Sequence, residues 1–117
     1  MVNSRRKGKE GELEFARECR EAGYEAARRS QQYCGVAGDA DVIGLPGLHV
    51  EVKRVNRLNI EQAMEQARSD AQAGELPVVA HRKDGGKWLV TMELDTFWRL
   101  YREWEAGEYM RAKGWIE

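Results

Sequence analysis

Two carboxylates and one ammonium group lie close together in the stretch GDADVIGLPGLHVEVKR, residues 38–54. Two apolar segments flank a Leu-Pro-Gly turn in this stretch, which predicts an antiparallel hairpin. With the turn centred on Pro46, Asp41 lies directly opposite Glu51, and Lys53 is the next residue on the same face of its strand. Carboxylates that face each other destabilise a sheet unless positive charge lies between them. The stretch therefore predicts a divalent-metal site.

Hydrolysis of a phosphodiester is the chemistry that these groups suit. Oxygen ligands from Asp41, Glu51 and the Val52 carbonyl favour a hard cation, Mg²⁺ or Mn²⁺. Such a metal lowers the pKa of a bound water and neutralises the charge that develops on the phosphate. We expect Lys53 to orient or deprotonate the attacking water and to hold the phosphate.

A third carboxylate is predicted from the first helix, residues 7–22. The inward stripe of this helix contains Phe15, Ala16, Cys19 and Ala22. Glu12 lies three and four residues before the start of this stripe and so falls on the same face, whereas Glu10 and Glu14 fall off it and are interpreted as solvated charges. Because a carboxylate on a buried face is costly unless paired or metal-bound, Glu12 is a further site candidate.

The surrounding pattern predicts an α/β fold with a central mixed sheet flanked by helices, in the order αβββαββα. Asn59 is expected to cap the second helix, with Gln62 completing a capping-box pattern. An apolar stripe of this helix packs on the sheet: Ile60, Ala63, Met64, Ala67 and Ala71. The expected strands are residues 24–30, 40–45, 48–53, 76–83 and 87–92, and the last helix is residues 95–104.

Asp41 and the Glu51-Val52-Lys53 triplet match the Asp…Glu-X-Lys signature of the PD-(D/E)XK nuclease superfamily, with Ala40 in place of the usual proline. The segment RKGKEGELEFARECREAGY resembles the opening of archaeal-type Holliday junction resolvases, their phage relatives and the small VRR-NUC-like nucleases. In those proteins a catalytic glutamate follows a Lys-Gly pair, four residues after the glycine, and counting from Gly8 gives Glu12. The resemblance covers residues 5–92. It implies a restriction-endonuclease-like fold, a Mg²⁺- or Mn²⁺-dependent DNA endonuclease and, for paired incisions, a homodimer.

Several assignments stay open at this point. The resemblance places a glutamine near the site, which is Gln62 or Gln66, and Gln62 also suits a purely capping role. Asp39 competes with Asp41 as the metal ligand, but Asp41 immediately precedes the apolar pair, as the family pattern requires. Phosphate contacts are the preferred interpretation of the basic residues Arg5, Arg6, Lys7, Lys9, Arg28, Arg29, Arg54 and Arg57, whose alternative is ordinary surface charge.

Composition sets the remaining expectations. A length of 117 residues predicts one nuclease domain, in which we expect residues 1–6 to be flexible and residues 106–117 to form a tail. The net charge of −1 gives no independent support for a nucleic-acid partner. Cys19 and Cys34 lack CxxC spacing and there is no signal-like or membrane-spanning run, so we expect reduced thiols in the cytoplasm of a bacterial, archaeal or phage-infected cell. His49 and His81 have no zinc-ligand spacing with these cysteines.

The aromatic residues are expected to be mainly core, with an exposed remainder available for a dimer contact: Trp88, Phe97, Trp98, Tyr101, Trp104 and Trp115. Functional alternatives to a junction resolvase are a nicking, flap or restriction-type nuclease, a DNA-binding subunit with little activity, and an adaptor that uses the C-terminal aromatic helix.

Overall fold

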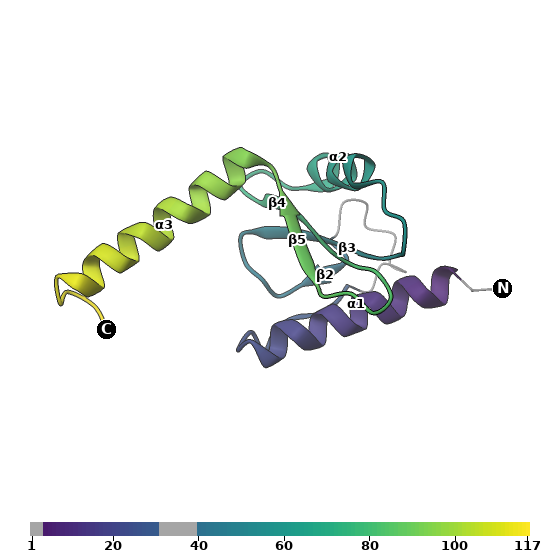
Figure 1. Cartoon of the computed structure of the whole chain (residues 1–117), viewed down its shortest axis with the longest axis horizontal. Helices are drawn as coiled ribbons and strands as arrows, with labels where there is room; N and C mark the ends of the chain where they lie inside the picture. Colours follow the sequence, from purple (N-terminus) through teal and green to yellow (C-terminus); the bar gives the residue numbers. More distant parts are fainter. Residues whose placement is uncertain (1–3, 31–39) are drawn as a thin grey trace.

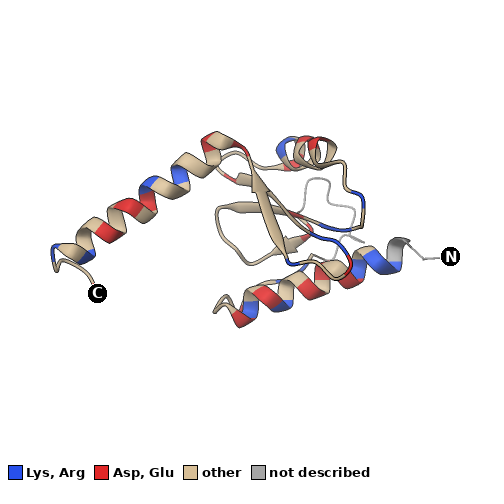
Figure 2. Ribbon diagram, in the orientation of Figure 1, with Lys and Arg blue, Asp and Glu red and all other residues tan. Residues whose placement is uncertain are grey.

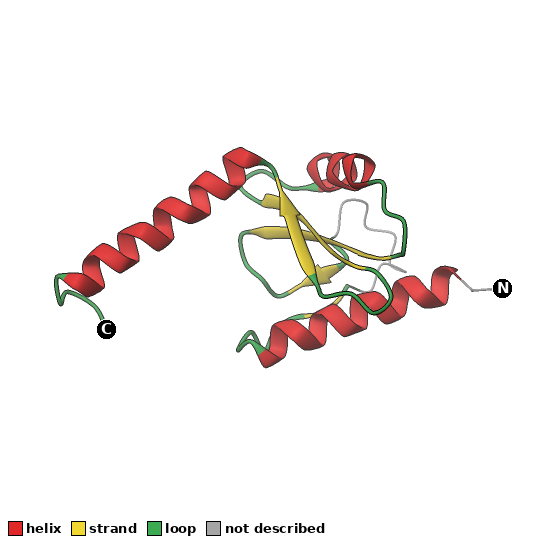
Figure 3. Cartoon of the chain, viewed as in Figure 1, coloured by secondary structure: helices red, strands yellow, loops and turns green. Residues whose placement is uncertain are grey.

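A computed structural model describes residues 4–30 and 40–117, with side chains from residue 6 onward in the first range. The elements run α1 (Ser4–Glu21), β1 (Arg28–Arg29), β2 (Val42–Ile43), β3 (Leu48–Arg54), α2 (Ile60–Asp70), β4 (Leu76–Arg82), β5 (Leu89–Met92) and α3 (Leu94–Ala112). This is the predicted order of helices and strands, and Figure 1 and Figure 3 show a twisted sheet with helices around it.

The five strands form one mixed sheet in the order β1-β2-β3-β4-β5. β1, β2 and β3 pair antiparallel, β3 and β4 pair parallel because α2 forms the crossover between them, and β5 returns antiparallel to β4. Val42 lies opposite Val50, so the predicted hairpin register is confirmed. Gly44 follows β2 and has a φ of 98°, which glycine adopts without strain. It lies so close to the backbone of Ala26 that a Cβ would not fit there.

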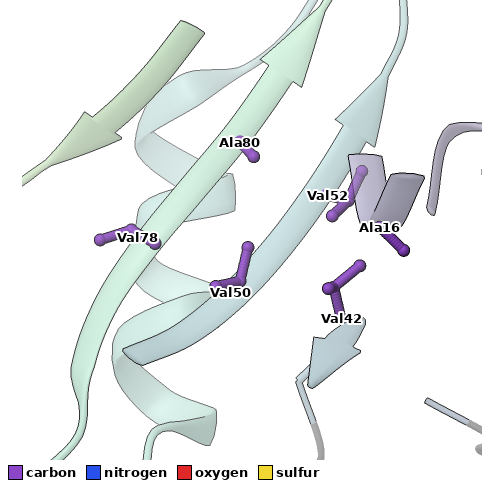
Figure 4. Close-up of a cluster of buried hydrophobic side chains, with 6 residues drawn as sticks. All are labelled: Ala16, Val42, Val50, Val52, Val78 and Ala80. Carbon is purple, nitrogen blue, oxygen red and sulfur yellow. The ribbon is translucent and has the colours of Figure 1, made fainter. Parts of the chain in front are cut away.

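β3 is covered on both faces. Its valines face α1, in a cluster that Figure 4 shows and that contains Ala16, Val42, Val50, Val52, Val78 and Ala80. On the opposite face α2 contributes Ala63, Met64 and Ala67, which pack with Val79 of β4. Since residues in register share a face, Glu51 beside Val79 belongs to the α2 face. The prediction that the valines point into a core is confirmed.

Gly23 as the stop after α1 and Asn59 as the N-cap of α2 are confirmed, while α1 begins at Ser4 rather than Lys7 and ends at Glu21 rather than Ala22. Gly23, with φ of 108°, follows α1, and the Tyr24 N–H donates to the Cys19 carbonyl at 3.0 Å. Asn59 caps α2, its side-chain oxygen accepting from the Gln62 N–H at 3.1 Å. Cys19 is a buried free thiol, whereas Cys34 and Asp39 lie outside the described residues.

Two expectations about α1 and its surroundings are wrong. Ala22, expected on the inward stripe, is exposed, because α1 ends at Glu21. Glu14 is not a solvated charge: its carboxylate accepts hydrogen bonds from the Arg82 guanidinium and from Trp88 Nε1, the latter at 3.1 Å. Trp88 also packs on Phe15, with ring centroids 5.1 Å apart, so it is the one member of the predicted aromatic core that joins the body of the protein.

The prediction for the C-terminal aromatics is wrong. α3 extends to Ala112 rather than Trp104, because Glu, Ala, Met and Arg continue as good helix formers until Gly114, whose φ is 77°. Five aromatic side chains expected in the core are exposed instead: Phe97, Trp98, Tyr101, Trp104 and Trp115. Within the described residues, no helix has both the length and the apolar character needed to cross a bilayer.

Candidate active site

Glu51 is the most buried carboxylate of the site. Its side chain is 2 % exposed in the middle of β3, and its Oε1 lies 2.8 Å from Nε2 of His49, which is 1 % exposed. Strand alternation explains this pair, since residues two apart point to the same face. A charged group in such a place has lost its hydration and requires compensation from neighbouring groups or from an ion.

Asp41 immediately precedes β2 and reaches across to β3. Its Oδ2 accepts a hydrogen bond from the Val52 N–H at 2.8 Å, while its own N–H donates to the Val50 carbonyl at 2.9 Å. The N–H and C=O groups of one strand residue point to the same side. The Val52 carbonyl therefore faces Asp41 as well, which brings together two of the predicted metal ligands.

The pKa of Glu51 shows how closely the two carboxyl groups interact. This pKa is raised from 4.5 to about 8: burial is the largest cause, the charge of Asp41 and a hydrogen bond to it act in the same direction, and the charge of Lys53 opposes them. In the metal-free protein Glu51 is therefore protonated at neutral pH. A divalent cation would replace this proton, because it supplies the positive charge that two adjacent carboxylates lack.

Glu12 approaches the same position from α1. Burial raises its pKa, the charge of Asp41 raises it further, and Arg29 and Lys53 oppose the shift. Arg29 Nε donates to Glu12 Oε2 at 2.5 Å. α1 and β3 pack closely at this point. A Cβ added to Gly11 would lie 2.5 Å from Cβ of Arg54, whereas a Cβ added to Gly8 would meet no atom within 4 Å. Gly11 thus permits the close approach of α1 to β3 next to Glu12.

Lys53 completes the predicted group at the end of β3. Its Nζ lies 3.3 Å from Oε1 of Gln66 on α2. Gln66, the second of the two glutamines considered, is therefore the one that contacts the lysine, while the Gln62 backbone receives the helix cap. Both glutamines line one open depression along α2, together with Glu65, Ser69 and Asp70.

Three side chains near Glu51 or its partner His49 were not predicted as functional candidates: His49 itself, Asp70 and Glu75. His49, Glu51 and Asp70 bring ligand atoms within 4.8 Å of one another, and Glu75 Oε1 lies 3.7 Å from Nδ1 of His49. The signal for His49 was its position two residues before Glu51 on the same face. For Asp70 and Glu75 the only signal was their acidic character at the two ends of the α2–β4 connection, which does not indicate where they point.

The predicted DNA-contacting residues have varied surroundings. Figure 2 shows basic residues gathered at the N-terminal end of α1 and on the segment after β3. Arg6, Lys9, Arg28 and Arg57 are exposed, whereas Lys7 lies 3.6 Å from Asp84, Arg54 pairs with Asp84 and Glu14, and Arg29 binds Glu12. The Arg5 side chain lies outside the described residues.

Asp41 and Lys53 thus lie within electrostatic reach of both Glu12 on α1 and Glu51 on β3. These three carboxyl groups, with the Lys53 ammonium group and the Arg29 guanidinium that binds Glu12, form an oxygen-rich site suited to a hard cation, with Gln66 and the Val52 carbonyl at its margin. No protein-family model, curated protein or solved structure matches this chain.

Proposed function

We propose that this protein is a metal-dependent DNA endonuclease that hydrolyses phosphodiester bonds with Mg²⁺ or Mn²⁺. The observation that supports this most directly is the position of Asp41, whose charge raises the pKa of both Glu12 and Glu51, while Lys53 opposes both shifts. A purely structural salt-bridge cluster would balance these charges. Here Arg29 and Lys53 balance two of the three carboxyl groups, and Glu51 can ionise only with a further positive charge, which favours a role in binding a divalent ion.

The donor set fits a hard cation. Asp41, Glu51 and the Val52 carbonyl would hold it, and Glu12 would act through its hydration shell or directly. When bound, a divalent ion of this kind supplies a more acidic water and neutralises charge on the phosphate. Lys53 would orient the water and contact the scissile phosphate, and the contact to Gln66 restricts where its ammonium group can lie.

A nucleic-acid substrate is favoured because of where basic residues lie, and DNA is the polymer that the resemblance to PD-(D/E)XK nucleases implies. Lys53 is followed by Arg54, which pairs with Asp84 and Glu14, and by the exposed Arg57. Figure 2 shows basic residues of this segment on the same side of the molecule as those at the N-terminal end of α1, where Arg6 and Lys9 are exposed. Phosphate contacts from such residues would position a backbone over the acidic site without reading sequence. The charge on the rest of the surface is mixed, and the net charge is −1.

The test is cleavage of labelled four-way junction, flap, duplex and single-stranded DNA in Mg²⁺, Mn²⁺ or EDTA. Asp41→Asn should abolish cleavage, and Lys53→Met should lower the rate by about 10²-fold or more. Asp95→Asn and Lys87→Met, on exposed positions of α3 and of the segment before β5, are matched controls that should retain it.

The substrate that is cut separates the nuclease alternatives. Symmetric cuts confined to the junction would support a resolvase, whereas cuts in flaps or duplex would support a nicking or restriction-type enzyme. DNA binding without metal-dependent cutting of any substrate would refute the proposed activity and favour a DNA-binding subunit.

A further inference from the structure

A second group of metal-ligating side chains lies on the α2 face of β3, beside the proposed active site. His49 and Glu51 both point to this face, and their side chains are 1 % and 2 % exposed. Asp70 is the last residue of α2. One ligand atom from each of the three residues lies within 4.8 Å of those from the other two. The group therefore brings one imidazole and two carboxyl groups together from a strand and a helix.

The distances within this group suit a single cation. Imidazole nitrogen and carboxylate oxygen bind transition metals at about 2.0–2.2 Å, so ligand atoms on opposite sides of an ion are about 4.2 Å apart and adjacent ones about 3 Å. His49 Nε2 and Glu51 Oε1 already lie 2.8 Å apart, as adjacent ligands would. The upper limit of 4.8 Å within the group exceeds the opposite-side distance by about 0.6 Å, which small side-chain rotations would close.

The surroundings of His49 orient its ring as a metal ligand. Its Nδ1 lies 3.7 Å from Oε1 of Glu75, which itself accepts a hydrogen bond of 2.7 Å from the Gln72 N–H. Metal-binding histidines typically direct their second ring nitrogen at a carboxylate, which fixes the ring and makes the ligating nitrogen more basic. His49 Nε2 is therefore the nitrogen that faces the group, toward Glu51.

The negative charge of Asp70 lacks a counterion. Among the ion pairs of residues 6–30 and 40–117, none includes Asp70. Burial and Asp41 are the main causes of the raised pKa of Glu51, and the charge of Asp70 acts in the same direction. Asp70 also lies at the C-terminal end of α2, where the helix dipole disfavours a carboxylate and favours a cation. A cation between these carboxyl groups would remove both penalties.

The group is open to the surface on two sides. Asp70 lines the open depression along α2. His49 lines a second depression, beside the turn that follows β2, together with Gln72 and Glu75. An ion therefore has an approach to these ligands although His49 and Glu51 are almost completely buried.

We propose that His49, Glu51 and Asp70 bind a divalent first-row transition cation such as Mn²⁺ or Zn²⁺. This site is separate from the one that Asp41 and the Val52 carbonyl would complete. An imidazole ligand favours such ions, whereas a set of oxygen ligands alone suits Mg²⁺. The bound ion would fasten the end of α2 to β3. The site shares Glu51 with the proposed active site but does not depend on nuclease activity.

The test is the detection of nitrogen bound to Mn²⁺ by pulsed electron paramagnetic resonance. An imidazole ligand gives a nitrogen hyperfine coupling, and the chain has only two histidines, His49 and His81. The full chain should show this coupling with Mn²⁺, also in excess Mg²⁺, and His49→Gln should remove it. His81→Gln is the matched control: His81 Nε2 lies 2.8 Å from Thr91 Oγ1, away from this group, and its replacement should leave the coupling intact.

Asp70→Asn is the second variant, because Asp70 is partly exposed at a helix end and lies outside the core, so its replacement should not affect folding. It should weaken Mn²⁺ binding at the nitrogen-coupled site by about tenfold or more, whereas Glu61→Gln, an exposed position on α2, should not. The site would be overturned by a wild type without nitrogen coupling, by coupling that His49→Gln retains, or by unchanged Mn²⁺ affinity in Asp70→Asn.

Asp41→Asn separates this inference from the proposed function. It should abolish DNA cleavage and keep the nitrogen coupling, whereas loss of the coupling would mean that the two groups form one site. Cleavage by a wild type that shows no coupling would overturn the His49 site alone. Coupling in a wild type that cuts no DNA would overturn the nuclease activity alone.

Discussion

Replacing Glu51 with glutamine should stabilise the metal-free protein at alkaline pH while removing a metal ligand. Glutamine keeps the shape of the side chain and can still hydrogen-bond to His49 and Asp41, but it carries no charge. In the wild type the folded-state pKa of Glu51 is about 8, against 4.5 for the unfolded chain, chiefly because of burial. Folding therefore favours the protonated carboxyl group.

The sign and size of the effect follow from this difference. The contribution of protonated Glu51 to stability is fully present below pH 4.5 and is lost as the pH rises through 8, because the unfolded chain then releases a proton that the folded chain retains. The full difference corresponds to about 5 kcal/mol. Between pH 5 and pH 9 the stability of the wild type should therefore fall relative to Glu51→Gln by about 4 kcal/mol.

The assay is urea unfolding of both proteins in EDTA at several pH values from 5 to 9. Glu65→Gln, an exposed position on α2, is the matched control and should follow the wild type. Addition of Mn²⁺ at pH 8 should restore the stability of the wild type and leave Glu51→Gln unaffected. If the two stability curves remain parallel over this pH range, Glu51 is not the strongly perturbed group described above.

Three further outcomes are expected. Mn²⁺ affinity, measured by titration calorimetry, should rise about tenfold per pH unit from pH 6 to 8 and then level off, because Glu51 must lose its proton to bind; a flat profile would exclude it as a ligand. Gly44→Ala should lower the free energy of unfolding, measured in urea, by about 2 kcal/mol or more, since the new Cβ would lie 2.3 Å from the Ala26 carbonyl oxygen. Gly47→Ala, at a φ of 90° but with open space around it, should lower it by only about 1 kcal/mol. Asn59→Ala should cost about 1 kcal/mol in the same assay and Asn59→Ser much less, and equal losses would contradict its capping role.

Much of the fold and part of the candidate site were predictable from local pattern. The register of Val42 opposite Val50 follows from the position of the Leu-Pro-Gly turn, and with it the meeting of Asp41 and Glu51. Helical spacing alone selected Glu12 over its neighbour Glu10, which is exposed and paired with Arg6. In each case the relevant neighbours lie within one hairpin or one helix, where backbone geometry determines direction.

Contacts between distant segments were not predictable in this way. Gln66 rather than Gln62 contacts Lys53 because the crossover geometry of α2 determines which turn lies over the end of β3. Glu14 binds Arg82, 68 positions further along the chain, although its place on the helix wheel indicated a solvated charge. Periodicity assigns a side chain to a face, but it does not identify the group that covers that face.

The sequence by itself determined the order of helices and strands, the hairpin register and the three carboxylates and lysine of the candidate site. Only the tertiary structure decided that β4 lies parallel to β3, that His49 and Asp70 approach Glu51, and that the aromatic side chains of α3 are exposed rather than buried. The physical reason is the same throughout: short-range backbone geometry fixes where a side chain points, whereas burial depends on which distant segment packs against it.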